Sequence, residues 1–219
     1  LITIANLKYF KNLQNCKIKT KTDKKIENSC NTLPDILYLT YGVAKGGGNM
    51  KENQLVKRAQ KGDKAAFCEL YSLYKDRLYR YAYYKLSNED DANDAVMDCV
   101  LSAFEQITQL KNRDAFCSWI FTILYAKISK LIDTQAKLRQ SEVFETRQND
   151  ISLSYSHSDL SLELQYALSK LNDDEKDIVL LCTVAGFSSK ECAKLVGLTS
   201  GSVRSKLSRS LAKMRKYLE

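Results

Sequence analysis

With 219 residues, the chain is long enough for one or two domains, and its single Pro and eight Gly favour helix over sheet. The formal net charge of +8 is unevenly placed, because a basic C-terminal end follows an acidic segment. This pattern suits one focused contact with nucleic acid and excludes a uniformly basic coat.

The cysteine and histidine content argues against a metal site or an enzyme. The seven Cys occur singly, without metal-ligand spacing, and the only His is His157. We therefore expect no bound metal, no cofactor and no catalytic site. Unpaired Cys on apolar helix faces suit a reducing cytosol. No apolar run approaches the roughly 20 residues of a membrane span, so we expect a cytoplasmic protein with no membrane partner.

The first 49 residues are rich in Lys and Asn and have no sustained helical period. They end in Lys45-Gly46-Gly47-Gly48 shortly before Met50, and codons for Lys-Gly-Gly can contain a bacterial ribosome-binding sequence. We therefore expect translation to begin at Met50, with residues 1–49 being read-through of an untranslated leader. A disordered basic arm is the alternative that the sequence leaves open.

Residues 50–140 contain three segments with helical periodicity, which together predict one compact helical domain. The first segment follows Asp63, a suitable helix cap, and stops at Leu86-Ser87-Asn88. The second carries a regular apolar stripe over Ala92–Ile107. The third, which begins at about Asp114, carries another such stripe.

An acidic row lies on the second segment, opposite its apolar stripe: Asp91, Asp94 and Asp98. From the row alone, a solvated helix face and a contact with a basic partner are equally good interpretations. Trp119 lies on the apolar stripe of the third segment, where core packing is the default role. The Tyr-rich stretch Tyr71–Tyr84 favours core packing with an amphipathic surface over a platform for stacking bases.

Residues 141–160 are polar and rich in Ser, without a helical stripe, and predict a flexible tether. A second helical domain, residues 161–219, follows this tether. Two capping boxes have the required spacing in it: Asn172 with Glu175, and Ser188 with Glu191. Helices are therefore expected to begin at Asn172 and at Ser188.

The last 32 residues have the pattern of a helix-turn-helix motif. Gly197 suits a left-handed turn residue, Thr199 is a plausible cap, and a basic helix with Val203 on its inner face follows. This stretch holds eight Lys/Arg against two Glu. Two helices crossed in this way place the second one in the DNA major groove. Any basic amphipathic helix could mimic the second half alone, but the combination favours DNA binding.

Six segments of the two domains match one known pattern: Leu55–Phe67, Leu70-Tyr71, Arg77–Arg80, Asp90–Val96, Phe116–Phe121 and Ala167–Leu171. In this order, over about Asn53 to Leu218, the chain resembles a bacterial RNA polymerase sigma factor of the small extracytoplasmic-function (ECF) type. The resemblance implies an all-α fold of two small helical domains, regions 2 and 4, joined by a flexible linker. It implies a transcription-initiation factor whose partners are core RNA polymerase and promoter DNA. Many members also bind an anti-sigma protein, which is a further candidate partner.

The resemblance also implies three binding surfaces. The acidic row is a candidate contact for basic residues of the largest polymerase subunits, through Asp91, Asp94 and Asp98. The −10 promoter element and its unpaired strand would contact Trp119, Tyr125, Lys127, Lys130, Lys137 and Arg139. The −35 element would contact the last helix through Ser200, Ser202, Arg204, Lys206 and Arg209.

One departure from the family pattern concerns the −10 surface. Members usually carry an Arg-Asn pair about six residues after the tryptophan, where this chain has Tyr125-Ala126. We expect Tyr125 to stack on an unpaired promoter base. Two alternatives to a working sigma factor stay open: a stand-alone helix-turn-helix transcriptional regulator, and a degenerate relative that binds polymerase without melting DNA.

Overall fold

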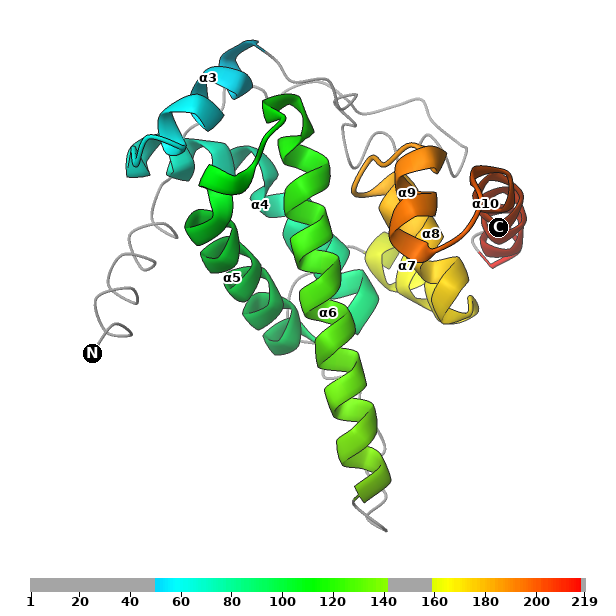
Figure 1. Cartoon of the computed structure of the whole chain (residues 1–219). Coiled ribbons are helices and arrows are strands. Elements are labelled where there is room, and N and C mark those ends of the chain that lie inside the picture. The colour runs from blue at the N-terminus through cyan, green and yellow to red at the C-terminus, as the bar shows by residue number, and fades with distance from the viewer. Residues whose placement is uncertain (1–49, 142–158, 218–219) are drawn as a thin grey trace. The chain divides into compact units, whose positions relative to one another are not determined.

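The computed structural model describes residues 50–141 and 159–217, without the side chains of residues 139–141 and 159–162 (Figure 1). Every regular element in these two ranges is a helix, which confirms the predicted all-α class. The described residues belong to one compact unit. The predicted leader, nearly all of the predicted tether and His157 lie outside them.

Residues 50–141 form the first helical region. Its α-helices are α3 (Met50–Ala59), α4 (Lys64–Leu86), α5 (Glu89–Gln106) and α6 (Phe116–Ser141). Two 3-10 turns, Ile107–Gln109 and Arg113–Ala115, connect α5 to α6. α4, α5 and α6 pack on one another, and α3 packs on α4. The three predicted periodic segments correspond to α4, α5 and α6.

Local sequence signals determine where these helices begin and end. The Asp63 carboxylate accepts a hydrogen bond from the Ala66 amide at 3.1 Å and begins α4, as predicted. Ser87 takes the left-handed conformation (φ 56°) after the end of α4. Asn88 then caps α5 by accepting a hydrogen bond from the Asp91 amide at 3.0 Å. The break between α4 and α5 therefore lies at Leu86-Ser87-Asn88, as the sequence predicts.

Aromatic and aliphatic side chains fill the core of this region. The Phe67 ring of α4 meets the Phe104 ring of α5 edge-on, with centroids 5.1 Å apart. Phe121 of α6 is fully buried, and so is the predicted stripe of this helix at Phe116, Ile120, Leu124 and Ile128. These positions recur every three or four residues, so one face of α6 lies in the core.

α6 differs from the expectation that no apolar run approaches the length of a membrane span. By length and composition alone, the segment Arg113–Leu138 is long and apolar enough to cross a membrane. A single such helix is weak evidence for a membrane span, because the core helix of a protein passes the same test. Its most apolar face is buried against α4 and α5.

Residues 159–217 form the second helical region. Its helices are α7 (Asp159–Ser169), α8 (Asp173–Thr183), α9 (Ser189–Val196) and α10 (Ser200–Arg215). Both predicted capping boxes are present, at Asn172 for α8 and at Ser188 for α9. α8 ends at Thr183, before Gly186, which has a positive φ of 74°.

α9, the turn and α10 form the predicted helix-turn-helix motif. Gly197 has a φ of 70° and ends α9 in the left-handed conformation. The Thr199 hydroxyl caps α10 by accepting a hydrogen bond from the Ser202 amide at 3.2 Å. Val203 and Met214 of α10 are fully buried. α10 packs on α8 and α9, so its opposite face points outward.

Candidate nucleic-acid interface

α10 carries the residues predicted to contact the −35 element. Ser202, Arg204 and Arg209 are exposed, and Ser200 is half-buried. The Ser202 hydroxyl lies 2.9 Å from the Thr199 hydroxyl, so it also takes part in the helix cap. An exposed arginine can form a bidentate contact with guanine or bind a phosphate. Arg204 and Arg209 are therefore the outward cations of this helix best placed for DNA.

Lys206, unlike Arg204 and Arg209, forms an ion pair with another helix. Its Nζ is 3.2 Å from Asp174 Oδ2 at the start of α8. A second pair on the same side joins Lys213 Nζ to Glu175 Oε2 at 3.4 Å. These pairs connect α10 to the acidic first turn of α8, a contact that sequence reasoning missed. The acidic run Asp173-Asp174-Glu175 was the signal available for it. A DNA contact by Lys206 stays a prediction.

The acidic row of α5 divides into two parts. Asp94 and Asp98 are exposed, and Met97 between them leaves 38% of its surface exposed. Asp91 is half-buried, and its Oδ2 accepts a hydrogen bond from Gln135 Nε2 of α6 at 3.0 Å. Asp91 therefore helps to hold α5 on α6, whereas Asp94 and Asp98 are free to meet a basic partner.

The predicted −10 residues lie along α6. Lys130 and Lys137 are exposed, and Lys127 is half-buried. Trp119 is half-buried, with its ring centroid 5.8 Å from that of Phe116, so part of the indole packs on the core. Arg139 belongs to the last turn of α6, and its side chain lies outside the described part. The two exposed lysines lie about two turns apart, with the exposed Asp133 between them on the same face.

Tyr125 of α6 lies near Asp177 of α8, and its side chain is half-buried. Burial raises the pKa of Tyr125, and the negative charge of Asp177 raises it further. The tyrosine therefore stays protonated. Its proximity to Asp177 had no signal in the sequence.

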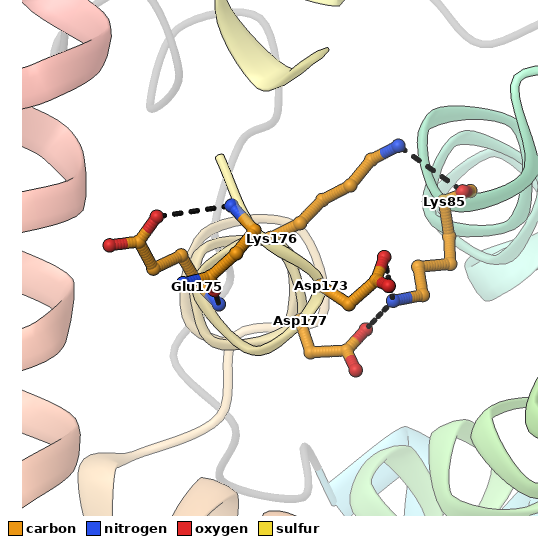
Figure 2. A network of polar contacts seen from close by, with 6 residues as sticks. Lys85, Asp173, Glu175, Lys176 and Asp177 are labelled. Atoms are coloured by element: carbon orange, nitrogen blue, oxygen red, sulfur yellow. Dashed lines mark hydrogen bonds and ion pairs between the residues drawn. The ribbon is translucent and has the colours of Figure 1, made fainter. Parts of the chain in front are cut away.

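Asp177 holds a lysine from α4 (Figure 2). Lys85 Nζ lies 2.7 Å from Asp177 Oδ1 and 3.8 Å from Asp173 Oδ1. The backbone of the same residue is also bound, because Lys176 Nζ of α8 donates to the Lys85 carbonyl at 3.2 Å. The Lys85 side chain is 6% exposed and that of Asp177 is 13% exposed. Burial raises the pKa of Asp177, against the lowering effect of the Lys85 ammonium.

A second contact joins α4 and α6 to the turn after α8. Arg77 of α4 donates from Nε to the Val184 carbonyl at 3.2 Å and from Nη2 to the Ala185 carbonyl at 2.6 Å. The Arg77 guanidinium lies 5.5 Å from the Phe121 ring centroid. Phe121 in turn meets Phe187 edge-on at 6.3 Å. The contact thus combines hydrogen bonds to orphan helix-end carbonyls with aromatic packing.

Tyr81 of α4 lies fully buried near this junction, and its hydroxyl has no hydrogen-bond partner among the described residues. A buried polar group without a partner is destabilising. We expect Tyr81→Phe to leave the free energy of unfolding unchanged or to raise it by up to about 1 kcal/mol.

Tyr74 provides a matched comparison on the same helix, because its hydroxyl donates to Glu52 Oε1 at 2.6 Å. Tyr74→Phe should lower the free energy of unfolding by about 1–2 kcal/mol. Urea denaturation followed by circular dichroism measures both changes. A larger loss for Tyr81→Phe than for Tyr74→Phe would show that the Tyr81 hydroxyl has a partner after all.

The cysteines of the described ranges are free thiols. Cys99 is fully buried, donates to the Ile120 carbonyl at 3.5 Å, and burial raises its pKa to about 12. It therefore behaves as a small apolar side chain. Within residues 50–141 and 159–217, no group of three His, Cys, Asp or Glu side chains lies close enough to hold a metal ion.

The two helical regions match two models of one protein family. Residues 70–137 match sigma-70 region 2, and residues 161–214 match sigma-70, region 4. Together the matched ranges span more than half of the chain. The first range covers the acidic row and the candidate −10 residues except Arg139, and the second covers the helix-turn-helix motif.

Known proteins with similar sequences are named as ECF RNA polymerase sigma factors. The chain is 28% identical over 176 residues to the ECF RNA polymerase sigma factor BldN of Streptomyces coelicolor, covering 75% of this chain and 65% of that protein. It is also 28% identical over 166 residues to the ECF sigma factor SigE of Mycolicibacterium smegmatis, covering 72% and 64%. The matched part thus spans slightly less than two thirds of each relative.

Two solved structures have a similar fold. One is the sigma factor RpoE in complex with the anti-sigma factor NepR from Bartonella quintana, with a TM-score of 0.57, 24% identity, and coverage of 69% of this chain and 96% of that chain. The other is CnrH in complex with the cytosolic domain of CnrY, with a TM-score of 0.56, 22% identity, and coverage of 77% and 97%. At such identities, the likeness concerns the fold alone.

Proposed function

The chain belongs to the sigma-70 family, within which it resembles the ECF sigma factors, and from this premise we propose that it binds core RNA polymerase and directs it to promoters. In this proposal it recognises −10 and −35 elements and promotes initiation in the cytoplasm. It supplies no catalytic group, so the chemistry of RNA synthesis belongs to the polymerase. The observation that carries the proposal is the presence of both sigma regions, in family order, on one chain.

The −35 contact is assigned to α10. Its outward face carries Arg204 and Arg209, and its other side packs on α8 and α9. A helix of this kind fits the DNA major groove with its N-terminal half against the bases. Ser200, Ser202 and Lys206 flank the two arginines, and they complete the proposed surface.

The −10 contact is assigned to α6. Lys130 and Lys137 supply positive charge for the phosphates, and the half-buried Trp119 and Tyr125 supply aromatic faces. Unpaired bases stack on aromatic rings with little dependence on sequence. This combination supports capture of a single strand rather than recognition of a duplex groove.

The polymerase contact is assigned to the exposed part of α5. Asp94 and Asp98 provide negative charge, and Met97 provides an apolar contact between them. Charge complementarity at such a surface sets mainly the rate and orientation of docking. An anti-sigma protein is a further proposed partner, because both solved structures of similar fold contain a second protein and one is named an anti-sigma factor.

Transcription from fragmented host genomic DNA tests the proposal. Core polymerase is incubated with and without the full chain, and the transcript starts are sequenced. New starts that share a two-part upstream sequence are the expected result. Core binding without new starts would favour a degenerate relative, to which the Tyr125-Ala126 departure points. Neither binding nor new starts would favour a stand-alone DNA-binding regulator.

Asp94→Lys tests the polymerase surface. Reversing this exposed charge should weaken binding to core polymerase about tenfold or more, because a like charge then faces the basic partner. Binding is measured by fluorescence anisotropy of labelled protein. Asp76→Lys, which reverses an exposed charge on α4, is the control and should bind like the parent. Equal affinities of the two variants for core would remove Asp94 from the docking surface.

A further inference from the structure

Both lysines of α10 are paired with carboxylates in the first turn of α8. Lys206 Nζ lies 3.2 Å from Asp174 Oδ2, and Lys213 Nζ lies 3.4 Å from Glu175 Oε2. The two lysines are seven residues apart, so they lie on one side of α10, two turns from each other. That side of the helix is therefore positively charged and already has negative charge beside it.

The two pairs differ in how firmly the carboxylate is held. Glu175 is 22% exposed, and its Oε2 also accepts a hydrogen bond from the Asn172 amide at 3.1 Å as part of the capping box. Asp174 is 72% exposed, and within the described part of the chain its carboxylate binds only Lys206. Glu175 thus has a structural role at the start of α8, whereas Asp174 acts on Lys206 alone.

Lys206 lies where a phosphate contact is expected. It is two residues after Arg204 and three before Arg209, the two exposed cations of the proposed −35 surface. A lysine at the edge of such a surface binds a phosphate, and that contact carries no sequence information. Lys206 can make this contact only by giving up the carboxylate of Asp174.

We infer that Asp174 is a counter-charge that keeps Lys206 from DNA phosphates and thereby lowers the affinity of the helix-turn-helix motif for DNA of any sequence. This role of Asp174 rests on the proposed function, since α10 is the helix assigned there to the −35 element. Arg204 and Arg209 bind without such an exchange, so DNA binding depends more on them than on Lys206.

A lower affinity for DNA suits a factor that acts together with polymerase. Phosphate contacts hold a basic protein on the many competing non-specific sites of a genome. Asp174 cancels one such contact without changing the exposed side chains that face the bases. In the proposed function the polymerase and the −10 surface supply further affinity, so the free chain stays available to core polymerase.

The exposure of the Lys206–Asp174 pair sets the size of the expected effect. An exposed ion pair changes an equilibrium by at most about fivefold. Removing the carboxylate should therefore raise the DNA affinity by about two- to fivefold. If the released Lys206 binds a phosphate, the plot of log affinity against log salt should also become steeper, by up to about 0.9.

Asp174→Asn and Asp173→Asn form a matched pair of variants of the full chain. Each removes one negative charge from the first turn of α8, so the general electrostatic gain and the effect on the helix dipole are similar. Asp173 is 95% exposed and forms its ion pair with Lys85 of α4 at 3.8 Å. Figure 2 shows Asp173 and Glu175 on opposite sides of α8. The capping box is left intact in both variants, and circular dichroism checks that both are folded.

Fluorescence anisotropy with a labelled mixed-sequence DNA duplex, over a range of NaCl concentrations, measures the affinity and its salt slope. Asp174→Asn should bind about two- to fivefold more tightly than Asp173→Asn at low salt, with the steeper slope. Asp174→Glu, which keeps a carboxylate at this position, should bind like the parent. Equal affinities and slopes of the two Asn variants, or tighter binding by Asp174→Glu than by the parent, would overturn the inference.

Lys206→Ala shows whether the gain passes through this lysine. Added to each of the two Asn variants, it gives two double variants of equal net charge. These should have the same affinity for the duplex and the same salt slope. A gain that persists when Asp174→Asn is combined with Lys206→Ala would mean that Asp174 repels DNA directly, and it would contradict the role assigned to Lys206.

The outcome is separable from that of the proposed function, because the binding measurement contains no polymerase. A steeper slope for Asp174→Asn without new transcript starts from the parent chain would support the counter-charge and count against the sigma-factor role. New transcript starts from the parent chain, with identical DNA binding by Asp174→Asn and Asp173→Asn, would support the role and overturn the counter-charge.

Discussion

Replacing Phe121 by alanine is expected to lower the free energy of unfolding by about 3–5 kcal/mol. The Phe121 ring is fully buried, and its centroid lies 5.9 Å from that of Tyr81 and 6.3 Å from that of Phe187. The Arg77 guanidinium covers the ring at 5.5 Å. The substitution therefore loses apolar burial, leaves a cavity and removes the partner of a cation–π contact, and these losses add.

Guanidinium denaturation of the full chain, followed by circular dichroism, measures this loss. Leu73→Ala is the control, because Leu73 lies on α4 with 56% of its surface exposed. That substitution should change the free energy of unfolding by less than about 0.5 kcal/mol. A loss below about 1.5 kcal/mol for Phe121→Ala would mean that the site collapses around the missing ring.

Helix ends were predictable from the sequence because their signals are local. Asp63, Ser188 and Thr199 each cap a helix through an amide only three residues further on. Gly197 supplies the positive φ that ends α9. Such contacts depend on spacing along the chain and need no knowledge of the tertiary arrangement.

The contacts between elements were not predictable in the same way. Lys85 lies 92 positions before Asp177, and Arg77 lies more than 100 positions before the carbonyls that it binds. A helical period says which face of a segment is apolar, but it does not say which other face covers it. The family resemblance therefore led us to expect Tyr125 to stack on a base, without indicating that its side chain is half-buried near Asp177 of α8.

The same limit affects single charges on predicted surfaces. Helical spacing placed Lys206 with Arg204 and Arg209, and it placed Asp91 with Asp94 and Asp98. In the structure, Lys206 faces Asp174 and Asp91 faces Gln135. Long polar side chains interact with partners on other helices. The members of a row of like charges therefore differ in how far they are available to a binding partner.

Arg204→Ala is expected to weaken promoter binding by about 1–3 kcal/mol if the guanidinium contacts a base edge. The side chain is exposed on the outer face of α10, one turn from the capped N-terminus, where base contacts of a recognition helix are made. The loss should be confined to promoters that carry the contacted base, and a changed base at that position should remove the difference between parent and variant.

Arg215→Ala is the matched control, since it removes the same exposed cation from the last turn of the same helix. Affinities are measured for holoenzyme on promoters found by the transcription experiment, over a range of salt concentrations. A phosphate contact would instead give Arg204→Ala a similar loss on every promoter and a salt slope smaller by about one. If Arg204→Ala and Arg215→Ala behave alike on all promoters, α10 does not present Arg204 to the bases, and the −35 surface must be assigned to other residues.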